Sequence, residues 1–156
     1  MASTIRSIQL DDIPQIAQWM ATVPLWQRYN LTETVVTKQF QKAIMEQALI
    51  IVIEVDEQPE IAGFAWYSRQ GAFARSPYLK QIGIHPKLTG MGIGGQLLTY
   101  IEDDCKQSSD QLFLLVSDFN TEAQKFYQHH GYAHIGTIPN YVLANVAELI
   151  YHKRLI

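Results

Sequence analysis

The sequence predicts a single domain over residues 1–156 of α/β (α+β) class, with a mixed central sheet of about seven strands flanked by about four helices. Three observations support this prediction. A chain of 156 residues, of which 47% are hydrophobic and 17% charged, has the size and composition of one globular domain with a core. Short runs rich in branched and aromatic residues alternate with segments of helical periodicity. A glycine-rich turn in mid-chain joins a strand directly to a helix.

The first part of the chain is expected to form three strands and two helices. Residues 4–10 suit a strand, and Asp11 and Asp12 can cap a helix that has Pro14 in its first turn. A second helix is expected over residues 32–47, after an irregular segment at 21–31. The branched, apolar runs at 48–55 and 61–68 are separated by a short polar turn, which predicts a β-hairpin.

The middle of the chain contains the glycine-rich turn. After a loop over residues 69–77, a strand over 78–84 stops at His85-Pro86. A helix over 92–106 follows the turn. Its apolar face is expected to consist of Ile93, Leu97, Tyr100 and Ile101.

The last part alternates strands and one more helix. Residues 112–117 are the most apolar run, which indicates a strand inside the sheet. Asn120 can cap a helix over 121–130, and Gly131 can close it. Two final strands are expected near 132–138 and 147–155.

Composition and charge argue against several classes of function. The net charge is −3 and the pI about 5.9, so no basic surplus indicates nucleic acid or an anionic membrane as a partner. The single cysteine, Cys105, cannot form an intrachain disulfide, which fits the reducing cytoplasm. Its acidic neighbours favour a packing role over a nucleophilic one. The N-terminal segment lacks the apolar run of a signal peptide, and the longest apolar stretch, 48–53, is too short to span a bilayer.

Residues 90–95 read GMGIGG, with four glycines in six positions. Glycine permits close approach to a ligand, and the start of the next helix supplies free N–H groups, so the turn suits a phosphate or pyrophosphate. The glycines also match the dinucleotide fingerprint G-x-G-x-x-G, with Asp110 twenty residues beyond Gly90. Asp110, however, precedes its strand, whereas the ribose ligand of a dinucleotide domain follows one. A dinucleotide is therefore disfavoured, and a simple glycine turn is the other alternative.

The strand ending in IGIHP, the following TGMGIGG and the amphipathic helix resemble the coenzyme A motif Q/R-x-x-G-x-G/A of the GNAT acyltransferases. Thr89 replaces the usual Gln or Arg of that motif, so one long side chain near the phosphates is missing. The stretch LLVSDFNTEAQKFYQHHGY resembles a second family segment, and AELIYHKRL resembles the closing strand. The resemblance covers essentially the whole chain and implies one GNAT-like acetyltransferase domain over residues 1–156.

The resemblance implies transfer of an acetyl group from acetyl-CoA (coenzyme A) to a primary amine by direct attack in a ternary complex. The pyrophosphate is expected on backbone N–H groups of the loop. The preceding strand is expected to pair with the pantetheine arm and to direct an N–H toward the thioester oxygen. For Gly83, packing is the alternative explanation. The cofactor-binding residues expected are Ile82, Gly83, Ile84, Thr89, Gly90, Met91, Gly92, Ile93, Gly94, Gly95 and Asn120.

Tyr127 is the general acid that the resemblance implies, because a phenol of pKa ~10 can donate a proton or a hydrogen bond to the departing thiolate. It follows Asn120 by seven residues, so both lie near one face of their helix, about 10 Å apart along its axis. Asn120 is expected to bind the cofactor arm and to cap the helix. Core packing beside Phe126 and Ala123 is the alternative for Tyr127.

The general base is left open. The strand sequences YLKQIGI and LFLLVS contain no carboxylate, and the candidates are Glu33, Tyr141, His134 and an ordered chain of water molecules. His85 is expected to be a turn residue. No histidine spacing indicates a metal site.

The acceptor is expected to contact the variable segments, namely Trp26 and Tyr29 between the first two helices and Tyr141 between the last two strands. It is a small-molecule amine or an amine of a peptide or protein, and the chain is a monomer or a homodimer. A hypothesis from another class is a non-catalytic module that binds or senses acyl-CoA. The missing carboxylates and Thr89 favour that module, whereas the presence of Tyr127 and Asn120 argues against it.

Overall fold

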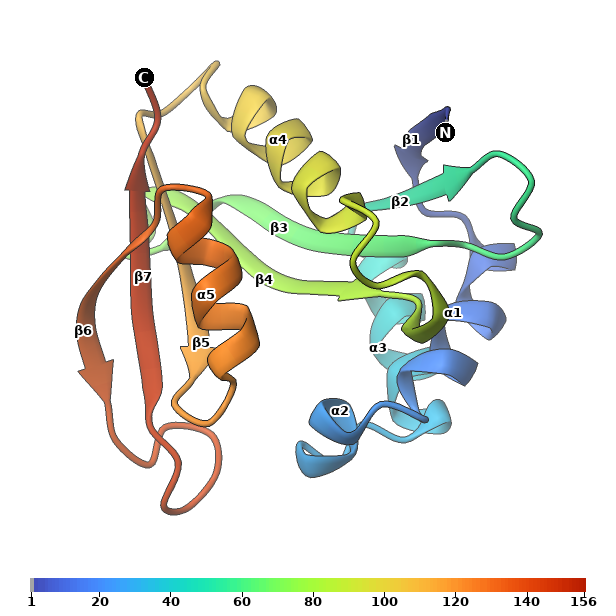
Figure 1. Cartoon of the computed structure of the whole chain (residues 1–156), viewed down its shortest axis with the longest axis horizontal. Coiled ribbons are helices and arrows are strands. Elements are labelled where there is room, and N and C mark those ends of the chain that lie inside the picture. Colours follow the sequence, from blue (N-terminus) through green and yellow to red (C-terminus); the bar gives the residue numbers. More distant parts are fainter. Residues whose placement is uncertain (1) are drawn as a thin grey trace. The chain divides into compact units, whose positions relative to one another are not determined.

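The computed structural model describes residues 2–156, and Figure 1 labels its elements. Seven strands in this range are hydrogen-bonded in the order β1-β2-β3-β4-β5-β7-β6. They are β1 (Ser3–Ser7), β2 (Leu49–Val55), β3 (Gly63–Ala72), β4 (Ser76–Ile84), β5 (Gln111–Ser117), β6 (Ala133–Ile138) and β7 (Glu148–Arg154). The helices are α1 (Ile13–Met20), α2 (Pro24–Arg28), α3 (Glu33–Met45), α4 (Ile93–Cys105) and α5 (Thr121–His129), with 3-10 turns η1 (Leu10–Asp12) and η2 (Pro86–Leu88). The mixed seven-stranded sheet confirms the predicted fold class.

Two segments differ from the expectation. Helix α2 lies in the stretch expected to be irregular, where Pro24 occupies the first turn, a position at which its missing N–H costs nothing. The expected loop over residues 69–77 is shorter, because β3 continues to Ala72 and β4 begins at Ser76. Phe73 and Ala74 make the turn in the left-handed region, with φ of 57° and 53°.

The contacts of the chain group it into two compact units. We call residues up to Trp66 together with Gln81–Thr99 the first unit, and Tyr67–Lys80 together with Tyr100–Ile156 the second unit. Strands β3 and β4 and helix α4 contribute residues to both. A single domain over residues 1–156 stays a prediction.

The core of the first unit is formed by α1 and α3, which pack together, and by residues of β2 and β3. Its buried side chains include Ile13, Ile16, Val36, Phe40, Ile50, Val52 and Phe64. Asp12 was expected to cap α1, but its side chain caps nothing there. Its carboxylate instead accepts two hydrogen bonds of 2.8 Å from Arg6 of β1 and one of 2.8 Å from the backbone N–H of Gln9.

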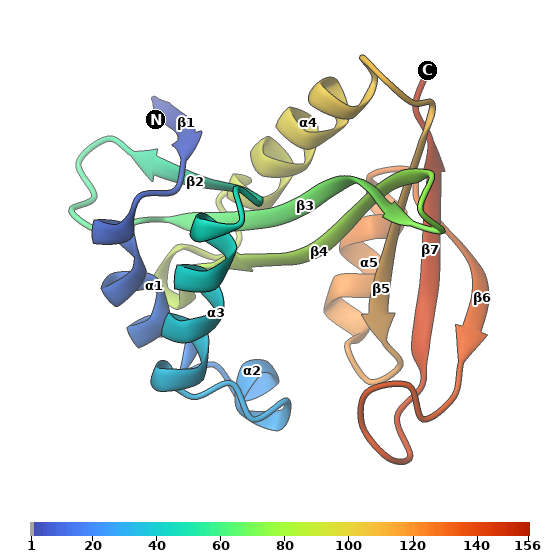
Figure 2. The same ribbon diagram turned by 180° about the vertical axis from the view of Figure 1, so that it is seen from behind.

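The second unit is organised around β5 and β7, with α5 running along them in both views (Figures 1 and 2). β5 pairs in parallel with β4 at Tyr78↔Phe113 and Leu79↔Leu114, and β7 pairs antiparallel with β5 and β6. As predicted, Asn120 caps α5, and Gly131 follows its end with a φ of 91°. On the neighbouring helix α4, the predicted face is correct except for Tyr100, which is 42% exposed, whereas Leu98 is buried.

Candidate active site

The glycine loop lies in the first unit, between η2 and α4. Gly90 and Gly92 have φ of 80° and 78°, a region that side chains other than glycine seldom adopt. A Cβ atom placed on either residue meets no atom within 4 Å. Internal packing therefore does not require these glycines, and the space beside them is open. Since α4 begins at Ile93, its unsatisfied first-turn N–H groups follow the loop directly. A phosphate-bearing ligand fits this arrangement.

The strand that precedes the loop is the end of β4, with Ile82, Gly83 and Ile84 as predicted. A Cβ on Gly83 would lie 2.5 Å from the ring of Phe64, so packing by itself explains this glycine. His85 is the turn residue expected: its Nδ1 accepts a hydrogen bond of 3.1 Å from the backbone N–H of Lys87. Thr89 is exposed just before the loop.

Asp110 lies directly before β5, at the N-terminal end of that strand. Its carbonyl accepts a hydrogen bond of 2.7 Å from the backbone N–H of Leu155, and its carboxylate lies 3.5 Å from Nε of Arg154. A ribose ligand of a dinucleotide fold lies at the other, C-terminal end of a strand. This placement supports the rejection of the dinucleotide interpretation.

Tyr127 is buried in the second unit, at 5% exposure. Its ring centroid lies 5.1 Å from that of Phe126, 5.7 Å from that of Tyr132 and 6.5 Å from that of Tyr151. The hydroxyls of Tyr132 and Tyr151 take part in hydrogen bonds, to Glu102 and Gln128. Within residues 2–156, no hydrogen bond of the Tyr127 hydroxyl is present. Packing thus holds the ring, and the hydroxyl makes no internal hydrogen bond within the described residues.

The electrostatics of Tyr127 follow from this burial. Burial first, and then the nearby Tyr78, raises the pKa of Tyr127 well above that of an ordinary phenol. The hydroxyl therefore keeps its proton at neutral pH and is available as a donor.

Asn120 occupies the turn between β5 and α5. Its Oδ1 accepts a hydrogen bond of 3.2 Å from the backbone N–H of Ala123, and its own N–H donates to the carbonyl of Ser117 at 3.0 Å. Gln124 donates to the same carbonyl at 3.2 Å. The cap uses the amide oxygen, so the Nδ2 group is the part of this side chain that a ligand could engage.

The candidate bases and acceptor residues are spread over both units. Glu33 is exposed at the start of α3, and Tyr141 is 59% exposed in the loop between β6 and β7. His134 is exposed on β6, where its Nε2 lies 2.8 Å from the carbonyl oxygen of Gly136. Trp26 is half-buried against the core of the first unit, which gives it a packing role, and Tyr29 directly follows the end of α2.

Two buried polar residues escaped the sequence analysis. Ser117 of β5 and Glu148 of β7 are 7% and 6% exposed and face each other in the antiparallel ladder. Tyr78 shares their face of the sheet, because it pairs with Phe113, four residues before Ser117. Burial first, and then Tyr141 and Glu148, raises the pKa of Tyr78. The β5–β7 register, which joins these groups, cannot be read from the local sequence.

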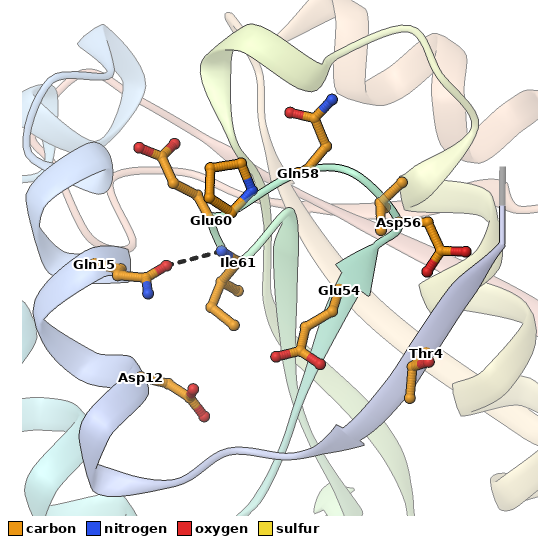
Figure 3. Close-up of a pocket in the computed structure, with 10 residues that line it drawn as sticks. Thr4, Asp12, Gln15, Glu54, Asp56, Gln58, Glu60 and Ile61 are labelled. Carbon is orange, nitrogen blue, oxygen red and sulfur yellow. Dashed lines mark hydrogen bonds between the residues drawn. The ribbon is translucent and has the colours of Figure 1, made fainter.

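A cavity of about 300 Å³ lies elsewhere in the first unit (Figure 3). Its lining includes Asp12, Glu54, Asp56 and Glu60, and Arg6 binds the first two of these carboxylates. An acidic lining repels the phosphates of a nucleotide. This cavity is therefore a poor match for the coenzyme expected at the glycine loop.

Cys105 is fully buried, and burial, followed by the charge of Asp104, raises its pKa to about 11. The thiol is a packing group, as expected. In the described range 2–156, no group of three or more His, Cys, Asp or Glu side chains could hold a metal ion. No helix of that range has the length and apolar character needed to cross a membrane.

The fold and the glycine loop are those of the acetyltransferase class. The family model of GNAT acetyltransferases matches residues 12–132, and the chain belongs to this family. The cofactor of the family is acetyl-CoA. A search of curated protein sequences finds no match.

Solved structures share the fold over nearly the whole chain. An N-acetyltransferase from Staphylococcus aureus is 18% identical, with a TM-score of 0.78 and 100% of both chains covered. The ribosomal-protein-S18-alanine N-acetyltransferase of Escherichia coli is 20% identical, with a TM-score of 0.73, over 99% of this chain and 94% of that one. YncA of Salmonella typhimurium, solved with acetyl-CoA, is 14% identical, with a TM-score of 0.73, over 100% and 95%. At these identities the likeness shows the fold alone.

Proposed function

We propose that this chain transfers an acetyl group from acetyl-CoA to a primary amine by direct attack in a ternary complex, with residues 1–156 acting as one domain. The observation that carries the proposal is the glycine loop. Its two left-handed glycines stand beside open space and lead into α4. Membership of the GNAT family supports acetyl-CoA as the ligand of this loop.

The backbone N–H groups of residues 90–95 are proposed to bind the pyrophosphate, since they adjoin the positive end of the α4 dipole, and the Thr89 hydroxyl is proposed to donate a hydrogen bond beside them. The backbone of Ile82, Gly83 and Ile84 is proposed to pair with the pantetheine arm, which Asn120 binds through Nδ2. When bound, acetyl-CoA supplies the acetyl thioester that the amine attacks. Thr89 lacks the long side chain of the family motif, so backbone groups carry most of the phosphate binding.

Tyr127 is proposed as the general acid toward the departing thiolate. Its ring is buried, and its hydroxyl is protonated at neutral pH and unused by internal hydrogen bonds. Because its raised pKa makes complete proton transfer to sulfur less favourable, the hydrogen bond to the developing negative charge does most of the stabilisation. This role predicts an effect on turnover rather than on cofactor affinity.

The acceptor is proposed to contact Trp26, Tyr29 and Tyr141. Structurally similar proteins act on different amines: the Escherichia coli enzyme on an alanine of ribosomal protein S18, and another, of 21% identity, on the antibiotic nourseothricin. Both small-molecule and peptide amines therefore belong in the test.

The experiment is an assay of free thiol release from acetyl-CoA with a panel of amines: an alanine-starting peptide, a lysine amide, a polyamine and a streptothricin antibiotic. Thiol release that depends on one of these amines is expected. The competing function is a module that binds acyl-CoA without chemistry. Tight acetyl-CoA binding without thiol release for any amine would favour that module.

A further inference from the structure

Glu148 is a buried carboxylate in the second unit, beyond the stretch that matches the family model. It lies on β7, directly opposite Ser117 of β5 and Ile138 of β6. Residues paired across antiparallel strands point to the same face, so the side chains of Glu148 and Ser117 lie together. Ser117 is three residues before Asn120, and its carbonyl accepts the Asn120 N–H. The carboxylate therefore lies at the end of β5, where the chain enters the helix that carries Tyr127.

Tyr127 and Glu148 lie on opposite faces of this sheet. Leu114 pairs with Tyr151, and Tyr151 contacts Tyr127, so Tyr127 approaches from the Leu114 face. Glu148 is three positions away from Tyr151, so it lies on the opposite face. Tyr78 shares the face of Glu148, because it pairs with Phe113 and Glu148 pairs with Ser117, four residues further along β5.

We infer that Glu148 is the general base of the proposed acetyl transfer and takes the first proton from the ammonium group of the acceptor. This inference rests on the proposed function. β4 and β5 contribute no carboxylate, and β7 supplies one beside β5. Tyr78 lies on the same face of the sheet as the carboxylate and offers aromatic surface to a cation there.

The protons balance as follows. The acceptor nitrogen loses two protons in becoming an amide. The first passes to the Glu148 carboxylate before attack and leaves to solvent. The second leaves as the C–N bond forms and the C–S bond breaks, and it balances the proton that the sulfur gains through the Tyr127 hydroxyl.

An amine that arrives neutral needs no first transfer, and this provides the test. The lysine side chain, with a pKa of about 10.4, arrives as ammonium at pH 7.4, whereas aniline arrives neutral. Rates for wild type and Glu148→Gln are measured with Nα-acetyl-lysine amide and with aniline. We expect a loss of about 100-fold for the lysine amide and only a few-fold for aniline. The rise in Tm caused by acetyl-CoA is expected to stay unchanged.

Glu102→Gln is the matched control. Glu102 is another largely buried carboxylate of the second unit, bound to Tyr132 and Lys153. Its neutralisation should leave the ratio of lysine-amide rate to aniline rate at the wild-type value. A loss specific to Glu148→Gln and to the lysine amide supports the assignment.

Equal losses for the two amines, or no loss, would overturn it. If Glu148→Gln no longer binds acetyl-CoA, Glu148→Asp is tested instead, because it keeps the carboxylate but shortens the side chain by one methylene. The lysine-amide rate should then fall more than the aniline rate, and equal falls contradict the inference. If the wild type accepts another amine of the panel, that amine replaces the lysine amide and its pH-dependent rate is compared in the same variants. A wild-type protein that releases thiol with no amine of the panel counts against the proposed function itself, so the two failures are distinguishable.

Discussion

The substitution Gly92→Val separates the folding role of the glycine loop from its binding role. Gly92 has a φ of 78°, and its missing Cβ would face open space. A side chain there causes backbone strain of about 1–2 kcal/mol without a steric clash inside the protein. For a chain of this size, that strain lowers Tm by about 2–8 °C. The same side chain obstructs the approach of a pyrophosphate to the loop backbone.

The assay is thermal unfolding with and without acetyl-CoA. At a hundredfold excess over Kd, a ligand stabilises the folded state by about 2.7 kcal/mol. We therefore expect acetyl-CoA to raise the Tm of the wild type by about 5–11 °C and that of the variant not at all.

Gly131→Val is the control for this experiment. Gly131 also has a positive φ, of 91°, and an added Cβ would lie 3.4 Å from the flexible end of Lys153. It should lower Tm through the same backbone strain and keep the full rise with acetyl-CoA. A Gly92→Val protein that keeps this rise would refute the assignment of the loop.

Three further outcomes are expected. Tyr127→Phe should lower kcat about 100-fold in steady-state assays. The Kd for acetyl-CoA and the folding stability should change little, because the hydroxyl makes no hydrogen bond within residues 2–156. Full activity of this variant would contradict the acid role. Burial alone would raise the pKa of Asp12, but hydrogen bonds from Arg6 and Gln9 outweigh it and lower that pKa. Asp12 therefore stabilises the fold above its unfolded pKa of about 3.9, and this stability is lost as the pH falls through the folded pKa. In acid denaturation, the stability difference between wild type and Asp12→Asn should shrink as the pH falls. A difference that is the same at every pH would contradict this. Cys105 should resist a thiol reagent until the protein unfolds, and rapid labelling of the native protein would show that its burial is wrong.

The features that sequence reasoning found are those set by neighbouring residues. Asn120 accepts the N–H of Ala123 three residues on, and Gly131 takes the left-handed conformation that closes a helix. The glycine loop is likewise defined by local backbone conformation and by the helix that follows it. Such signals lie within a few residues of one another, so one sequence is enough to read them.

The features that it missed depend on tertiary hydrogen bonds, on strand register or on an element too short to show a period. Asp12 was predicted to cap a helix, but its carboxylate accepts two hydrogen bonds from Arg6 of β1. Glu148 was passed over because its position opposite Ser117 is set by the pairing of strands 31 residues apart in sequence. Helix α2 is a single short turn, for which periodicity gives no signal. A tertiary hydrogen bond decides the case of Asp12, and strand register decides that of Glu148.

The most direct test of the account is a single turnover with acetyl-CoA labelled in its acetyl group and an amine identified in the panel. Mass spectrometry then follows the label in the amine and in the intact protein. Direct transfer predicts one labelled acetyl group on the amine for each free CoA thiol, and none on the protein at any time. Label that accumulates covalently on the protein would contradict the central claim. So would label that stays on CoA although acetyl-CoA binds the protein tightly.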